Sequence, residues 1–243
     1  MRNPRIYTPQ PLSAGTTLAL DENASHHLAR VLRFQIGHAI TLFNGDGNEY
    51  AATISAIDKR HVSVDIGRVA MADRESPLAI HLGIAISKGE RMDLVVQKAI
   101  ELGVATVTPL ISERVEVRLQ GERAEKKMQH WQGIVIAACE QCARNRVPEL
   151  NPITPLHDWI GSVLAERKFV LHHRSETCLG EMIKPRSVAL LIGPEGGLSE
   201  TEIALAERKD FTSLRLGPRI LRTETAPLAA LAVLQFAFGD LNN

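Results

Sequence analysis

Long apolar runs and cysteines are scarce in this sequence. Its 243 residues contain no run of 18 or more apolar residues, the length that a membrane-spanning helix needs, and the longest candidates, 188–192 and 227–238, are much shorter. No apolar segment follows the amino end, so we expect no signal peptide and a cytoplasmic protein. The three cysteines, Cys139, Cys142 and Cys178, are too few for a disulfide framework, and their odd number does not allow all of them to pair.

Net charge is also absent. The 28 basic and 28 acidic side chains cancel, and 44% of the residues are hydrophobic, which is typical of a soluble globular protein and excludes a disordered chain. Nucleic-acid binding is neither indicated nor excluded, because a local basic patch is compatible with zero total charge.

The first part of the chain has the two-residue period of β-strands. Tight turns such as Asn44–Gly47 separate the apolar stretches, and one helix is expected at 22–33 behind a capping Asp21. The predicted strands cover 16–20, 39–43, 49–57 and 61–69. Short strands with tight turns favour a small β-barrel, and the polar segment 71–77 is typical of a domain linker.

After this linker, strands alternate with helices. Strands are expected at 80–86, 105–111, 169–171, 187–192 and 213–216, and helices at 91–102, 122–144, 155–166, from 200, and at 227–238. This alternation predicts an α/β fold with a parallel sheet covered on both faces, whose ligands bind at the carboxyl ends of the strands. The last helix is apolar nearly all round, so it is either central core or a subunit interface.

Two loops with glycines leave the ends of predicted strands and lie close to one another in the sequence. In the first, Gly193–Gly197 precedes Ser199 and Glu202, which fit a capping box; the second, 216–226, carries several polar side chains. Glycines allow a ligand to approach the backbone, so the loops could form two sides of one pocket. The alternatives are an ordinary strand-to-helix turn and solvated loop charges. The spacing of the glycines fits neither a P-loop nor a dinucleotide-binding fingerprint.

Metal binding is not indicated. Cys139 and Cys142 lie inside a predicted helix, no second pair follows at zinc-finger spacing, and no carboxylate accompanies His26–His27 or His172–His173 at metal-ligand spacing. The basic and aromatic residues of the first module suit RNA phosphates and unstacked bases, but its basic and acidic side chains are equal in number, so any patch depends on their placement.

Five ordered motifs together resemble the RsmE family, bacterial enzymes that methylate N3 of a uridine in 16S ribosomal RNA. The motifs lie at 87–92, 97–104, 140–148, 191–199 and 216–226. Residues 5–7 and 27–33 are similar to the family's amino-terminal module, so the resemblance covers nearly the whole chain. One departure is Pro227, where a residue able to donate a backbone hydrogen bond is usual.

The resemblance implies a SPOUT-type methyltransferase working as a homodimer. Residues 1–72 would form an RNA-binding PUA-like β-barrel, and residues 73–243 an α/β domain whose carboxyl end forms a trefoil knot. S-adenosylmethionine (SAM) would be the cofactor, without a metal, and 16S rRNA, within the small ribosomal subunit, the partner. The implied cofactor-binding residues are Leu171, Ile192, Gly193, Pro194, Gly196, Gly197, Leu216, Gly217, Ile220, Leu221, Thr223, Thr225 and Ala226.

For catalysis we consider Glu140, Arg144 and Arg222, because methylation of N3 requires loss of a proton and stabilisation of the uracil anion. The expected RNA-binding residues are Arg5, His27, Arg30, Arg33 and Arg219. Two alternatives stay open: a related enzyme acting on ribose 2′-OH or on tRNA, and a non-catalytic RNA-binding assembly factor.

Overall fold

The computed structural model describes residues 3–117, 119–172 and 183–242 of the chain. The chain divides into two compact units. Unit 1 comprises Met1–Glu75 and Cys139–Val147, and unit 2 comprises Ser76–Ala138 and Pro148–Asn243. The sequence predicted one boundary near residue 72 and did not anticipate that Cys139–Val147 joins the first unit.

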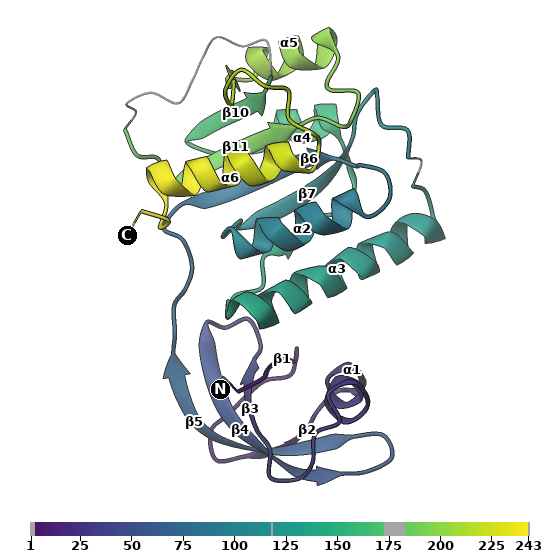
Figure 1. Cartoon of the computed structure of the whole chain (residues 1–243), viewed down its shortest axis with the longest axis vertical. Helices are drawn as coiled ribbons and strands as arrows, with labels where there is room; N and C mark the ends of the chain where they lie inside the picture. The colour runs from purple at the N-terminus through teal and green to yellow at the C-terminus, as the bar shows by residue number, and fades with distance from the viewer. Residues whose placement is uncertain (1–2, 118, 173–182, 243) are drawn as a thin grey trace. The chain divides into compact units, whose positions relative to one another are not determined.

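Unit 1 is built on one five-stranded sheet (Figure 1). Its strands, in spatial order, are β1 (Arg5–Tyr7), β3 (Ala39–Phe43), β4 (Asn48–Ile57), β5 (Val62–Met71) and β2 (Thr17–Ala19). β1 pairs with β3 in parallel and the other neighbours are antiparallel. Alternate residues of these strands are buried, which confirms the β-rich first module predicted from the period of two.

The helix expected at 22–33 is shorter in the structure, and it changes from an α-helix to a π-helix along its length. Helix α1 covers Glu22–His26, and a π-helical turn, His27–Val31, continues it. The predicted cap is confirmed, since the Asp21 side chain accepts a hydrogen bond from the Ala24 amide. The segment packs inward through the fully buried Leu28.

Unit 2 contains a seven-stranded sheet in which every pair is parallel. Its main path runs β12 (Phe211–Leu214), β10 (Arg167–Leu171), β11 (Ser187–Ile192), β6 (Ala79–Ala85), β7 (Thr106–Ile111) and β8 (Glu149–Leu150), and β9 (Thr154–Pro155) pairs with β7. The α/β class and the parallel sheet are therefore confirmed. The strand order does not test the trefoil knot, which stays a prediction.

Helices cover the sheet on both faces. They are α2 (Arg91–Glu101), α3 (Glu122–Cys142), α4 (Leu156–Ser162), α5 (Glu200–Arg208) and α6 (Thr225–Phe238). α4 and α5 share one apolar cluster with β7, β10, β11 and β12, while α2 and α6 pack together on the other side (Figure 1). α3 ends at Cys142, two residues before its predicted end, because Ala143 takes a left-handed backbone with φ +69°.

The apolar helix α6 carries one buried amide. Gln235 is fully buried, accepts a hydrogen bond from the Ser76 hydroxyl at 2.6 Å and donates to the Leu102 carbonyl at 3.0 Å. These bonds compensate the cost of removing the amide from water. Pro227 lies in the first turn of α6, where backbone amides need no helical partner, so the unusual proline does not disturb the helix. Among the described residues, no helix is long and apolar enough to span a membrane.

The packing of β6 against α4 yields a stability prediction. A Cβ atom at Gly83 would lie 2.6 Å from the ring of Trp159, a core side chain that is only 5% exposed. We expect Gly83→Ala to destabilise the protein by about 1–3 kcal/mol through overpacking. Thermal unfolding measures the effect.

Gly67→Ala is the matched control. Gly67 also lies in a strand, but its added Cβ would approach the Ala51 carbonyl oxygen at 3.5 Å, an ordinary contact. The control should leave the melting temperature unchanged or slightly raised. An equal loss of melting temperature in both variants would show that stability does not depend on the close packing of Trp159 against Gly83.

Candidate functional site

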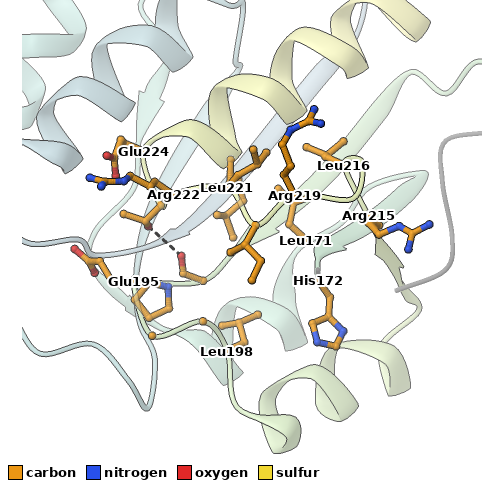
Figure 2. Close-up of a pocket in the computed structure, with 18 of the residues that line it drawn as sticks. Leu171, His172, Glu195, Leu198, Arg215, Leu216, Arg219, Leu221, Arg222 and Glu224 are labelled. Carbon is orange, nitrogen blue, oxygen red and sulfur yellow. Dashed lines mark hydrogen bonds between the residues drawn. The ribbon is translucent and has the colours of Figure 1, made fainter. Parts of the chain in front are cut away.

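A cavity of unit 2 lies at the carboxyl ends of three adjacent strands, β10, β11 and β12 (Figure 2). Its volume is about 660 Å³, within the range of small-molecule sites. The lining residues are Arg91, Leu171, His172, Ile192, Gly193, Pro194, Glu195, Gly196, Gly197, Leu198, Leu214, Arg215, Leu216, Gly217, Arg219, Ile220, Leu221, Arg222, Thr223, Glu224 and Ala226. The cavity is thus bounded by the two glycine loops and the end of β10.

The first loop, Gly193–Gly197, folds tightly on itself. A Cβ at Gly193 would lie 2.9 Å from the Leu198 amide nitrogen, and Gly197 has a left-handed backbone with φ +67°. After this turn, Ser199 and Glu202 form the predicted capping box at the start of α5, with reciprocal hydrogen bonds of 3.1 and 2.8 Å. Larger residues at these two positions would therefore clash at Gly193 and strain the backbone at Gly197.

The second loop, 216–226, is joined to the first through a buried hydroxyl. Thr223 is 8% exposed; its Oγ1 lies 3.2 Å from the Ser87 Oγ and donates to the Gly193 carbonyl at 3.4 Å. The loop ends where the Thr225 and Ala226 amides donate to the Arg222 carbonyl, at the start of α6. One threonine thus links both walls of the cavity to the segment after β6.

The cavity combines an apolar interior with a charged rim. Side chains such as Leu171, Ile192 and Leu221 suit a flat heteroaromatic ring, and the loop backbones offer hydrogen-bonding groups beside them. Gly197 lines the cavity, and a Cβ there would meet no atom within 4 Å, so the backbone is open to a ligand. These features fit a cofactor with an adenosine part, such as SAM. Within the described ranges, no group of three or more residues that could hold a metal was found.

Arginines dominate the charge of the rim. Arg219 and Arg222 are exposed and form no salt bridge within the part of the chain that the structure describes. The Nε of Arg215 is buried, and none of the residues that the structure describes forms a hydrogen bond with it. Figure 2 shows Arg222 at the same end of the cavity as Glu195 and Glu224, with His172 and Arg215 at the opposite end. The rim therefore offers cations to an anionic ligand.

The structure brings most of the expected site residues together. Of the residues expected to bind the cofactor, all but Thr225 line the cavity, and so do Arg219 and Arg222. The sequence did not single out Arg91 or Glu195 for the site, and Glu224 counted only among the polar side chains of the second loop. Glu195 and Glu224 lie inside the two glycine loops and Arg91 inside the motif 87–92, so their position in these motifs was the available signal.

Glu140 and Arg144 have their partners within unit 1. The Glu140 carboxylate accepts a hydrogen bond from the Tyr7 amide at 2.9 Å, and burial raises its pKa although that amide, His27 and Arg5 act in the opposite direction. Arg144 is only 5% exposed, and its Nε donates to both carboxylate oxygens of Glu75, at 3.1 and 3.2 Å. Their catalytic roles stay a prediction.

The expected RNA-binding residues of unit 1 differ in exposure. Arg5 is nearly buried; it pairs with Glu49, donates to Asn145 and lies over the Phe43 ring at 5.0 Å. Arg30 and Arg33 are exposed, whereas His27 is partly buried. The side chains of Arg30 and Arg33 are therefore both available to a partner.

Family models match both units. A model described as an RNA methyltransferase domain matches residues 74–235, and one described as an RNA methyltransferase PUA domain matches residues 20–67. Ribosomal RNA small subunit methyltransferase E of Buchnera aphidicola is 38% identical over 243 residues, covering 99% of each chain. The protein of the same name from Bacillus subtilis is 30% identical over 239 residues, covering 94% of this chain and 93% of the relative.

Solved structures agree with these matches. A methyltransferase from Legionella pneumophila, determined with bound SAM, is 48% identical, with a TM-score of 0.97 over 99% of this chain and 100% of the other. Ribosomal RNA small subunit methyltransferase E from Neisseria gonorrhoeae, also bound to SAM, is 40% identical, with a TM-score of 0.92 over 99% and 100%. The chain therefore belongs to the ribosomal RNA small subunit methyltransferase E family.

Proposed function

We propose that this protein transfers a methyl group from SAM to N3 of a uridine in 16S ribosomal RNA of the small ribosomal subunit. The observation that carries the proposal is the cavity between the two glycine loops, in a chain that matches two SAM-bound structures over almost its whole length. The names of the relatives support the small-subunit RNA as substrate, and the motif resemblance supports uridine N3.

SAM supplies a methyl group on a sulfonium that leaves as a neutral thioether, so the protein must align the reactants and manage one proton. Uracil N3–H is a weak acid, and negative charge develops on the ring as this proton leaves. Arg222, exposed at the rim and without a salt bridge within the described ranges, would hold the uracil oxygens and stabilise that charge.

The proton acceptor would be a carboxylate or water, and Glu140 is our candidate. Its raised pKa makes this carboxylate a stronger base than an exposed glutamate. For Arg144, the buried ion pair with Glu75 favours support of the turn after α3 over contact with uracil.

We also propose a homodimer formed through α6 and α2. Val233 and Phe236 of α6 are 40% and 62% exposed, and Leu94 of the neighbouring α2 is 41% exposed. A second subunit would remove these apolar groups from water.

The first experiment maps the product. The protein is incubated with labelled SAM and 30S subunits from a strain lacking the gene, and the modified nucleotide is identified. We expect 3-methyluridine in 16S rRNA. Arg222→Ala should lower turnover at saturating RNA and saturating SAM about 100-fold. Arg208→Ala, which removes an exposed arginine at the end of α5, should have no effect.

The alternatives give different products. A methyl group on ribose 2′-OH or on tRNA would support the related enzyme, and RNA binding without methylation or SAM binding would support an assembly factor. Either result would contradict the proposed reaction.

The second prediction concerns Gly197. Valine at this position would place branched carbon atoms in the cavity and strain the left-handed backbone, so Gly197→Val should weaken SAM binding at least tenfold, roughly 1.4 kcal/mol. Calorimetry measures the affinity. Gly121→Val is the control, because Gly121 has φ +52° and open space but does not line the cavity. Similar affinities for both variants would refute the placement of SAM at this loop.

The third prediction concerns RNA contact by unit 1. Arg30→Ala with Arg33→Ala should weaken RNA binding and reduce its salt dependence, because each lost phosphate contact lowers the slope by about 0.7 for a single strand. SAM affinity should not change. Filter binding over a range of salt concentrations tests this, with Arg60→Ala and Arg68→Ala, also exposed in unit 1, as the control. An unchanged slope in the first variant would mean that these arginines do not contact RNA phosphates.

A further inference from the structure

Arg91 connects the two walls of the cavity. It is the first residue of α2 and belongs to the motif 87–92, to which the reaction gives no role so far. Its Nη1 donates to Glu195 Oε1 at 2.9 Å, and its Nε lies 3.7 Å from Glu224 Oε2. Glu195 belongs to the first glycine loop and Glu224 to the second, so one guanidinium contacts a carboxylate on each side.

The rest of the segment after β6 reinforces this connection. The Lys88 amide donates to the same Glu195 oxygen at 3.0 Å, and the Ser87 hydroxyl lies 3.2 Å from that of Thr223 in the second loop. Burial would raise the pKa of Glu195, but hydrogen bonds from its own amide, from the Lys88 amide and from Arg91 lower it, so this carboxylate is ionised at neutral pH. Residues 87–91 thus contact both loops through charge and through hydrogen bonds.

We propose that Arg91 is a positioning residue that fixes the distance between the two glycine loops and so the width of the SAM-binding cavity. The inference rests on the proposed function, since it assigns SAM to this cavity. An arginine suits the task because its planar guanidinium presents donors on two edges, and one group can bind two carboxylates. Lysine carries a compact charge on a flexible stem, so it would fix the positions of the two carboxylates less rigidly.

The alternative role for Arg91 is neutralisation of charge. Without Arg91, Glu195 and Glu224 would leave two uncompensated carboxylates at one end of the cavity, where both line it (Figure 2). SAM carries one more positive charge than its product, S-adenosylhomocysteine. Uncompensated carboxylates would therefore strengthen the binding of SAM relative to that of S-adenosylhomocysteine. Loss of positioning would weaken both ligands equally, because they share every part except the methyl group. The ratio of the two affinities therefore separates the roles.

The test compares Arg91→Met and Arg91→Lys by calorimetry with SAM and S-adenosylhomocysteine. Arg91→Met should lower the affinities for both ligands about tenfold and by the same factor. The affinities of Arg91→Lys should lie between those of Arg91→Met and those of the parent. In steady-state kinetics, the KM for SAM should rise while kcat at saturating SAM stays near that of the parent. Lys98→Met is the matched control, because it removes an ion pair with Glu101, 2.7 Å long, on the same helix but outside the cavity.

The double variant Glu195→Gln with Glu224→Gln tests the positioning from the other side. It replaces both carboxylates with neutral amides, which bind a guanidinium more weakly, so it should weaken the binding of SAM and of S-adenosylhomocysteine in the same direction as Arg91→Met does. This variant keeps the test decisive if the arginine variant fails to fold. Unchanged affinities in these variants, or SAM binding strengthened relative to S-adenosylhomocysteine in Arg91→Met, would overturn the positioning role while the parent still binds SAM. A parent protein that binds neither ligand would overturn the proposed function itself.

Discussion

The parallel register of β12, β10 and β11 is the constraint on which the site depends. β10 pairs with β12 on one side and β11 on the other, so the glycine loops that follow β11 and β12 leave the same edge of the sheet with one strand between them. β10 lies between the two loops, and its last residue, Leu171, lines the cavity. Because the side chains under these strands are fully buried, the loops start from fixed positions, and close hydrogen bonds and ion pairs then set their separation.

Unit 1 contains a cluster of ion pairs around Glu49. Arg5 and Arg74 both bind this carboxylate, and Arg74 also donates to the Ala143 carbonyl at 3.0 Å. Ala143 has the left-handed backbone that ends α3, so these contacts stabilise a turn that would otherwise be strained. Arg5 and Arg74 thus stabilise the architecture of unit 1 itself.

The sequence predicted the elements and the glycine loops well, because their signals are local. β11 begins and ends where its apolar run does, and the cap of α5 follows directly from Ser199 and Glu202. The partners of charged residues were not predictable, since Arg5 and Arg144 look like free cations until the fold places Glu49 and Glu75 beside them. Arg91 was missed for the same reason: both its carboxylates lie more than a hundred residues away in sequence.

The central claim is that the two glycine loops enclose the methyl donor. A crystal structure of the protein with S-adenosylhomocysteine tests it most directly. We expect the ligand between residues 193–197 and 216–226, with its sulfur facing the end of the cavity that carries Arg222. A ligand bound elsewhere, or a cavity filled by side chains in the complex, would show that the two loops do not hold the methyl donor.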